Sequence, residues 1–107
     1  MDTIAKTPQP PYYAVIFTST RTNIENGYEE MATEMEKLVK VQPGFLGFES
    51  ARENIGITIS YWKDMESIKN WRENAAHEKA RENGRKMWYE SFKVRIAKVE
   101  RDYGFEK

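Results

Sequence analysis

The residues best suited to chemistry lie within one predicted helix. His77 is the sole histidine of the chain, and Arg81 follows four residues later, so the two side chains are neighbours on one helical face. Imidazole carries protons and binds metals at neutral pH, and the planar guanidinium group suits anionic oxygens. The pair predicts a polar ligand site. The alternative is a solvated helix face, with His77 flanked by Asn74 and Glu78.

The chain lacks the residues that several classes of enzyme require. The chain has no cysteine, which excludes disulfide frameworks, zinc knuckles and thiol nucleophiles. One histidine argues against a His-rich metal site and a Ser-His-Asp triad, so we expect no metal ion. No serine lies in the nucleophile-elbow pattern of hydrolases. The glycines around Phe45 lack the Lys-Ser/Thr and the helix that follow a phosphate-binding loop.

Length and charge indicate one small, neutral domain. The 107 residues match a single domain, and equal counts of 17 basic and 17 acidic residues argue against nucleic-acid or membrane-surface binding. The net charge is −3 over residues 1–62 and +3 over residues 63–107, which favours internal or subunit–subunit complementarity. The longest apolar stretch, Ala14–Phe17, is far below the ~20 residues of a membrane span. With no signal-peptide pattern before it, a cytoplasmic protein is expected.

The first half of the chain predicts an arm, a strand and a helix. Residues 1–11 hold three of the four prolines and are expected to form a flexible, extended arm. Tyr12–Thr20 is a strand that is apolar on both sides, as in the interior of a covered sheet. Thr22 and Glu25 resemble a capping box that opens a helix before Gln42. The apolar face of that helix has 3.6-residue spacing over Ile24, Tyr28, Met31, Met35, Leu38 and Val39.

The second half predicts the same alternation. Phe45–Glu53 and Ile55–Trp62 are strands joined by a tight turn. Asp64 caps the next helix, which directs Ile68 and Trp71 inward. A further helical stretch ends or bends at Gly84, and a last strand covers about Tyr89–Arg101.

This order is strand–helix–strand twice, the split βαβ plan of ferredoxin-like α+β domains. Right-handed crossovers place the helices on one face of a four-stranded antiparallel sheet. The other face would then expose a large apolar patch drawn from Tyr12, Tyr13, Val15, Ile16, Phe48 and Trp62. Monomers rarely tolerate such a patch, so we expect a homodimer that packs through this face.

Three short segments in this frame resemble a known family. Residues 42–50 have the sequence QPGFLGFES, residues 59–62 ISYW and residues 67–72 SIKNWR. Together they resemble the antibiotic-biosynthesis monooxygenase (ABM) family of dimeric α+β barrels, over about Tyr12–Tyr103. The resemblance implies one ABM-like domain over residues 12–103, with a ligand cavity between the sheet and the helices of each subunit.

The resemblance also implies two chemistries. In one, a small phenolic substrate is oxidised to a quinone by dioxygen without metal or flavin, and the protein orients the substrate and stabilises its anion. In the other, haem is both substrate and oxygen-activating cofactor, held by a histidine. Trp71 matches the tryptophan of both branches. Arg81 stands where the family's haem-ligating histidine lies, and Thr18 and Ser19 are the polar residues nearest its strand-one asparagine.

The resulting site hypothesis has two catalytic residues, Trp71 to wall or distort the substrate and Arg81 to bind its negative charge. The substrate-binding residues are Phe17, Thr18, Ser19, Met35 and His77, and His77 is also the cofactor ligand if haem binds. Two alternatives stay open. Trp71 and Arg81 can belong to the core and to a solvated surface, and the protein can be a non-catalytic dimeric module that binds a small ligand. An RNA-recognition module is disfavoured, because the third strand lacks the basic–glycine–aromatic pattern.

Overall fold

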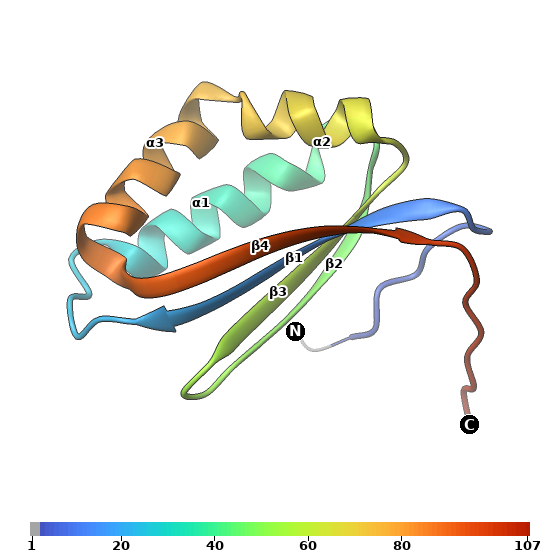
Figure 1. The fold of residues 1–107 in the computed structure, drawn as a ribbon, viewed down its shortest axis with the longest axis horizontal. Coiled ribbons are helices and arrows are strands. Elements are labelled where there is room, and N and C mark those ends of the chain that lie inside the picture. Colours follow the sequence, from blue (N-terminus) through green and yellow to red (C-terminus); the bar gives the residue numbers. More distant parts are fainter. Residues whose placement is uncertain (1–2) are drawn as a thin grey trace.

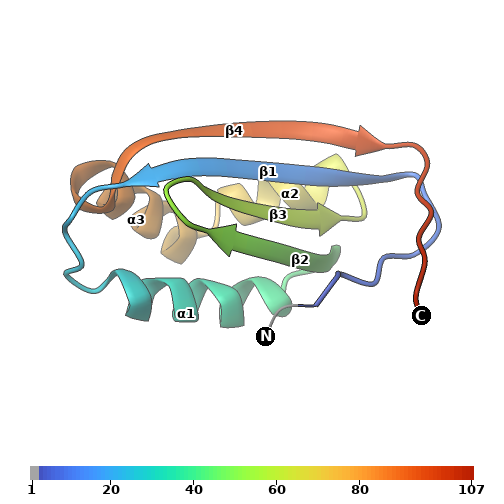
Figure 2. The same cartoon turned by 90° about the horizontal axis from the view of Figure 1, so that it is seen from below.

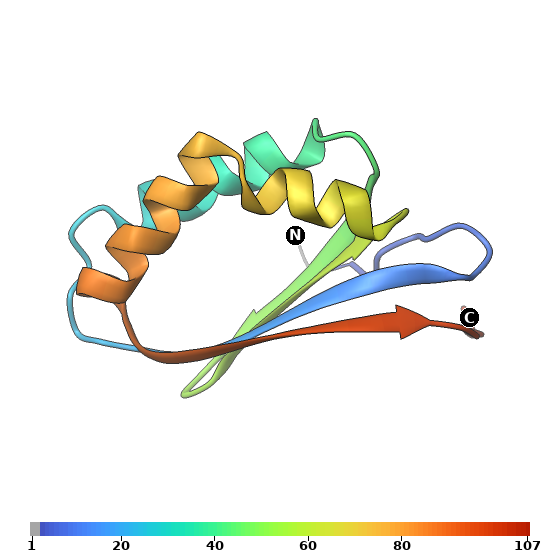
Figure 3. The ribbon, with the colours of Figure 1, turned by 45° about the horizontal axis from the view of Figure 1, so that its top comes forward.

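Four strands and three helices make up the chain in the computed structural model, which describes residues 3–107. Their order is β1 (Tyr12–Arg21), α1 (Tyr28–Lys40), β2 (Phe45–Arg52), β3 (Gly56–Trp62), α2 (Met65–Arg72), α3 (Ala75–Asn83) and β4 (Tyr89–Val99). The strands pair antiparallel in the order β2-β3-β1-β4. All three helices lie on one face of the sheet (Figures 1 and 3). The predicted ferredoxin-like α+β fold is confirmed.

Strand alternation decides which residues face the helices. In β1, Val15 and Phe17 line a cavity under the helices, so Ile16 and Thr18 point to the opposite, open face of the sheet. The register carries this division across the sheet, because Val15 pairs with Ser60 of β3 and cross-strand partners share a face. The open face carries Tyr12, Ala14, Ile16 and Thr18 of β1 and Ile59 and Tyr61 of β3 at its centre, and the charged residues Glu49, Lys93 and Arg95 on the two edge strands.

The core lies between the sheet, α1 and α2. Trp62 is fully buried and packs with Val39 of α1 and Ile68 of α2. Phe45 contacts Trp62 edge to face, with the ring centroids 5.4 Å apart. The sequence analysis named Trp62 and Phe48 as candidates for an apolar patch on the open face of the sheet, and this prediction is wrong for both residues. Trp62 is buried under the helices and Phe48 lines the cavity. Phe48 pairs with Ser60, which pairs with Val15, so all three lie on the helical side of the sheet.

The start of α1 differs from the capping-box prediction. The Thr22 hydroxyl donates to the Met87 carbonyl at 2.5 Å and does not cap a helix. Instead, the Glu25 carboxylate accepts bonds from the backbone N–H groups of Gly27 and Glu29, both at 3.1 Å. These two bonds lower the pKa of Glu25. The helix therefore begins at Tyr28, and Ile24, expected on its inward face, is 45% exposed in the preceding loop.

The turn after α3 joins the helical layer to β4. Gly84–Trp88 form one π-helical turn, so the regular helix ends at Asn83, as Gly84 predicted. A Cβ on Gly84 would lie 2.9 Å from the Tyr89 ring. The close approach therefore explains this glycine. It lets Tyr89, the first residue of β4, pack against the end of the helical layer.

The N-terminal arm and the C-terminal tail lie on the side of the sheet away from the helices (Figures 1 and 2). The backbone N–H of Ala5 donates to Glu49 at 2.9 Å, and the Thr7 hydroxyl donates to Tyr12 Oη at 2.9 Å. Tyr12 in turn donates to the Asp102 carboxylate of the tail. The expected flexibility of the arm stays a prediction. Its contacts place it beside the open face.

The described residues expose more surface than a compact monomer. The accessible surface is 8133 Å², against about 6,200 Å² for a compact protein of this mass by the usual scaling. The radius of gyration, 14.2 Å, also exceeds the roughly 13 Å of a compact chain of this length. Across residues 3–107, no helix has the length and apolar character needed to span a membrane.

Candidate functional site

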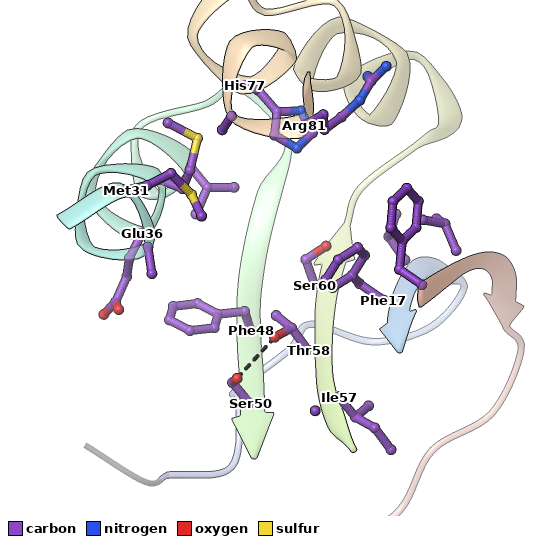
Figure 4. A pocket seen from close by; sticks show the side chains of 18 of the residues that line it. Phe17, Met31, Glu36, Phe48, Ser50, Ile57, Thr58, Ser60, His77 and Arg81 are labelled. Carbon is purple, nitrogen blue, oxygen red and sulfur yellow. Dashed lines mark hydrogen bonds between the residues drawn. The ribbon is translucent and has the colours of Figure 1, made fainter. Parts of the chain in front are cut away.

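A cavity of about 390 Å³ lies between the helices and the sheet. Figure 4 shows side chains from α1, α3 and the strands turned toward it. Its volume falls within the roughly 300–1,000 Å³ range of small-molecule sites. Its apolar wall includes Phe17, Met31, Met35, Phe48 and Val94. A largely apolar wall with few polar groups suits a small aromatic ligand.

The floor of the cavity carries a row of hydroxyls on the side of the sheet that faces the helices. Ser50 of β2 and Thr58 of β3 are cross-strand partners whose hydroxyl oxygens lie 2.9 Å apart (Figure 4). Ser60, two residues along β3, accepts a bond from Trp62 Nε1 at 2.9 Å. These hydroxyls keep the floor polar while the strands remain paired. They can donate hydrogen bonds to ligand oxygens.

The roof is built around Trp71 and His77, whose rings stack with centroids 4.4 Å apart and planes 13° apart. The break between α2 and α3 makes this possible. The Asn74 side chain accepts from the backbone N–H groups of Ala76 and His77 at 3.0 and 3.2 Å, as an N-cap residue does. The new helix thus starts at an angle that returns His77 over the indole of the preceding helix.

The hydrogen bond made by His77 fixes its tautomer. Nδ1 lies 3.1 Å from the Trp71 carbonyl oxygen, and because a carbonyl only accepts, Nδ1 carries the proton and Nε2 does not. Burial lowers the pKa of His77 to about 4; the Trp71 carbonyl opposes this shift and the Arg81 charge adds to it. His77 is therefore neutral at pH 7, with an unprotonated Nε2 as a hydrogen-bond acceptor. It is not the solvated helix histidine that its neighbours suggested.

Five of the seven site residues proposed from the sequence line one cavity. They are Phe17 of β1, Met35 of α1, Trp71 of α2, and His77 and Arg81 of α3. Arg81 is partly engaged already, because its Nη1 donates to the Arg72 carbonyl at 3.1 Å. Their roles toward a substrate stay predictions. The structure establishes that elements far apart in the chain bring these side chains to the same place.

The other two residues lie elsewhere. Thr18 points to the open face, because it alternates with Phe17 along β1, so its expected place in the pocket is corrected. Ser19 faces the helical side but is only 2% exposed. Its hydroxyl accepts a hydrogen bond from Arg52 Nη2, and Arg52, not Ser19, lines the cavity.

Tyr28, Arg52 and Tyr89 are among the polar residues that line the cavity and that the sequence analysis did not select. Burial raises the pKa of Tyr89, and a hydrogen bond with Tyr28 raises it further, so Tyr89 is a neutral phenol at pH 7. The Arg21 guanidinium lies 3.3 Å from the centroid of the Tyr28 ring. The sequence does indicate that Arg52 faces the cavity, because it follows Phe48 and Ser50 at two-residue strand spacing and so lies on the same face of β2.

A metal centre built from protein ligands has no support in the part of the chain that the structure describes. Over residues 3–107, no three His, Cys, Asp or Glu side chains gather to hold an ion. His77 is the single imidazole that the cavity offers, and its Nε2 lone pair is available. The donor set suits organic ligands, or a group that needs one nitrogen ligand.

Comparison with known proteins shows to which family the chain belongs. Residues 11–83 match the family described as antibiotic biosynthesis monooxygenase. The chain belongs to this family. The ABM assignment covers β1 through α3 and thus all of the elements that build the roof and floor of the cavity, except β4.

Relatives of this ABM protein agree with its fold. Protein YqjZ of Bacillus subtilis (strain 168), named as uncharacterized, is 51% identical over 109 residues, covering 100% of this chain and 96% of YqjZ. SnoaB of Streptomyces nogalater, a cofactor-independent oxygenase, superposes with a TM-score of 0.69 at 13% identity, over 92% of this chain and 100% of SnoaB. Rv0793 of Mycobacterium tuberculosis gives 0.74 at 9% identity, over 88% and 99%. At such low identities the two structures bear on the fold alone.

Proposed function

We propose that this protein is a cofactor-independent monooxygenase that oxidises a small phenol to a quinone with dioxygen. The observation that carries the proposal is His77, whose Nδ1–H bond to Trp71 leaves an unprotonated Nε2 in a mainly apolar cavity. A phenol hydroxyl is the natural donor to such an acceptor. Membership of the antibiotic biosynthesis monooxygenase family supports oxygenase chemistry.

The reaction balances without an external reductant. A phenol with a free para C–H reacts with one dioxygen to give a para-quinone and one water. One oxygen atom forms the new carbonyl and the other leaves in water with the phenol proton and the para hydrogen. The substrate supplies all the electrons, so the protein has to orient the ring, receive a proton and exclude bulk water.

His77 fits the proton step in spite of its low pKa. A neutral phenol is too weak an acid to protonate such a base before oxidation. Once an electron passes to dioxygen, however, the phenol O–H becomes strongly acidic, and its proton moves to Nε2. The Trp71 carbonyl accepts from Nδ1–H and stabilises the imidazolium that forms. In this scheme Trp71 walls the substrate, and Arg81 stabilises negative charge beside His77.

The test uses 1-naphthol, which has a free para position, under labelled dioxygen. We expect 1,4-naphthoquinone with one labelled oxygen, and one dioxygen consumed per quinone. His77→Ala should lower kcat/KM by about 100-fold, because it removes the proton acceptor. Lys79→Ala, an exposed residue of the same helix, is the matched control and should retain activity. Binding of 1-naphthol without oxygen consumption would instead indicate a non-catalytic binding module.

We also propose that the protein acts as a homodimer that packs through the open face. The excess accessible surface supports this, as do the apolar residues Ile16 and Ile59 on the two central strands of that face. Tyr103 and Phe105 of the tail are 89% and 87% exposed, which a second subunit would remedy. A particle mass of about 25 kDa, twice the 12.6 kDa of the chain, is expected by light scattering.

A second candidate, haem binding, rests on the same imidazole. A metal-ligating histidine commonly donates its other ring N–H to a carbonyl, and Nδ1 of His77 does so. Haem would supply oxygen activation, while His77 would provide a nitrogen ligand and Arg81 a partner for a propionate. Titration with haem should give a Soret shift that His77→Ala removes. An unchanged spectrum would exclude this candidate and leave the phenol oxidase.

A further inference from the structure

The charged groups that line the cavity do not balance. Arg52 and Arg81 line it together with one carboxylate, that of Glu36. Glu36 forms an ion pair with Lys40 at 3.3 Å, the sole salt bridge within residues 3–107, and Figure 4 shows its carboxylate turned away from His77 and Arg81. An anionic group of a ligand would therefore meet positive charge without a competing carboxylate.

Arg52 is held in a defined position by residues of two neighbouring strands. Its guanidinium lies directly against Gly56 of β3, where a Cβ would be 2.1 Å from both Cζ and Nη2. Gly56 pairs with Ser19 of β1, and the buried Ser19 hydroxyl accepts from Arg52 Nη2. The arginine thus reaches from β2 across β3 to β1. Gly56 has no left-handed backbone, and the Arg52 guanidinium occupies the space that a Cβ would take there.

These contacts engage only some of the N–H donors of the Arg52 guanidinium. Arginine has five N–H donors, and in the described chain Arg52 directs Nη1 and Nη2 to Ser19 alone, with Nη1 a weak 3.5 Å from its carbonyl oxygen. No carboxylate pairs with it within residues 3–107. Arg52 is exposed to solvent and lines the cavity. By comparison, Arg81 already bonds the Arg72 carbonyl.

We propose that Arg52 is the anion anchor of the cavity and that the ligand is an aromatic carboxylate. The carboxylate pairs with the planar guanidinium, and the aromatic ring lies against the apolar wall with its hydroxyl toward His77. The identity of the ring rests on the proposed phenol oxidation. The anchor itself rests on Arg52, Gly56 and Ser19. Arg52 is therefore a binding residue that selects acidic phenols over neutral ones.

The experiment compares two probes that differ by one carboxylate, 5-hydroxy-1-naphthoate and 1-naphthol. Binding is measured by calorimetry without oxygen at pH 7.5, so that turnover plays no part. The wild-type protein should bind the carboxylate at least about tenfold more tightly, the range of a charge-assisted bond. Arg52→Gln should remove this preference and leave 1-naphthol binding unchanged, whereas Arg52→Lys should retain part of it. Arg85→Gln, at an exposed arginine outside the cavity, is the control.

A second variant tests the anchor without removing the charge. Gly56→Ala displaces the guanidinium from its seat and should weaken carboxylate binding at equal 1-naphthol binding, with circular dichroism confirming the fold. The proposal is overturned if Arg52→Gln keeps the wild-type preference, or if neither probe binds the wild-type protein at millimolar concentration. Carboxylate selection without oxygen consumption would retain the anchor and refute the oxidase. Oxidation of 1-naphthol by the wild-type protein, with the carboxylate preference retained in Arg52→Gln, would refute the anchor and retain the oxidase.

Discussion

The buried imidazole of His77 makes the stability of this protein depend on pH in a window where few other groups titrate. The pKa of His77 falls from 6.5 to about 4 on folding, so the unfolded chain binds a proton more readily than the folded one. A histidine whose pKa is lower in the folded protein than in the unfolded chain stabilises the folded state when the imidazole is neutral. Stability should therefore fall as the pH drops below 6.5, and level off near pH 4.

The size of the effect follows from the two pKa values. Between pH 7 and pH 5 the unfolded histidine becomes almost fully protonated, while the folded one stays mostly neutral. The linkage relation gives a loss of about 2 kcal/mol in the free energy of unfolding over this interval. Carboxylates contribute little here, because they remain largely ionised above pH 5.

Two measurements test this reasoning on protein prepared without a histidine tag. Urea unfolding at pH 7 and pH 5 should show the loss of about 2 kcal/mol, and His77→Phe, which keeps a stacking ring but cannot titrate, should remove most of it. Because His77 is the sole histidine, its Hε1 resonance needs no assignment. We expect no titration of that signal between pH 8 and pH 5.5. A midpoint near 6.5 would refute the buried, neutral imidazole on which the proposed mechanism depends.

Three further predictions concern the scaffold. Asn74→Ala removes the N-cap bonds of α3 and should cost about 1 kcal/mol in urea unfolding, with a change in the Hε1 shift of His77. Gly44→Ala places a Cβ 2.0 Å from Ser67 Oγ at a φ of +82° and should destabilise the protein by about 1–3 kcal/mol; a melting temperature equal to that of wild type would contradict the strain. Ile59→Lys puts a charge on the open face and should give a folded particle of half the mass by light scattering, whereas an unchanged mass would reject this face as the interface.

The order of elements was predictable because each signal was local. Alternating side chains in β1 and β3, the Asp64 cap of α2 and the turn at Pro43 each depend on neighbours in the chain. The start of α1 was predicted wrongly, because Thr22 and Glu25 have the spacing of a capping box that does not form. The Thr22 hydroxyl binds the Met87 carbonyl instead, and this contact spans 65 residues.

The site was only partly predictable for the same reason. His77 and Arg81 were placed together by helical spacing, whereas Trp71 entered the predicted site through the family resemblance. The state of His77 depends on the break at Asn74, which returns the imidazole over the indole, and on the sheet that buries both. Arg52 was missed because its setting exists only when three strands pair in register. Thr18 was misplaced because a strand that is apolar on both sides does not reveal which side the helices cover.

The hydroxyl row on the floor shows why this cavity is more than a packing defect. Small domains need nearly all of their apolar surface in the core, yet Ser50, Thr58 and Ser60 occupy positions that face the helices. Their hydroxyls bond each other or Trp62, so they are satisfied without a ligand and do not destabilise the fold through unpaired groups. Such a floor gives up hydrophobic stabilisation that a protein with so few buried residues would otherwise need. A binding site explains that loss, and burial of the open face against a second subunit would offset it.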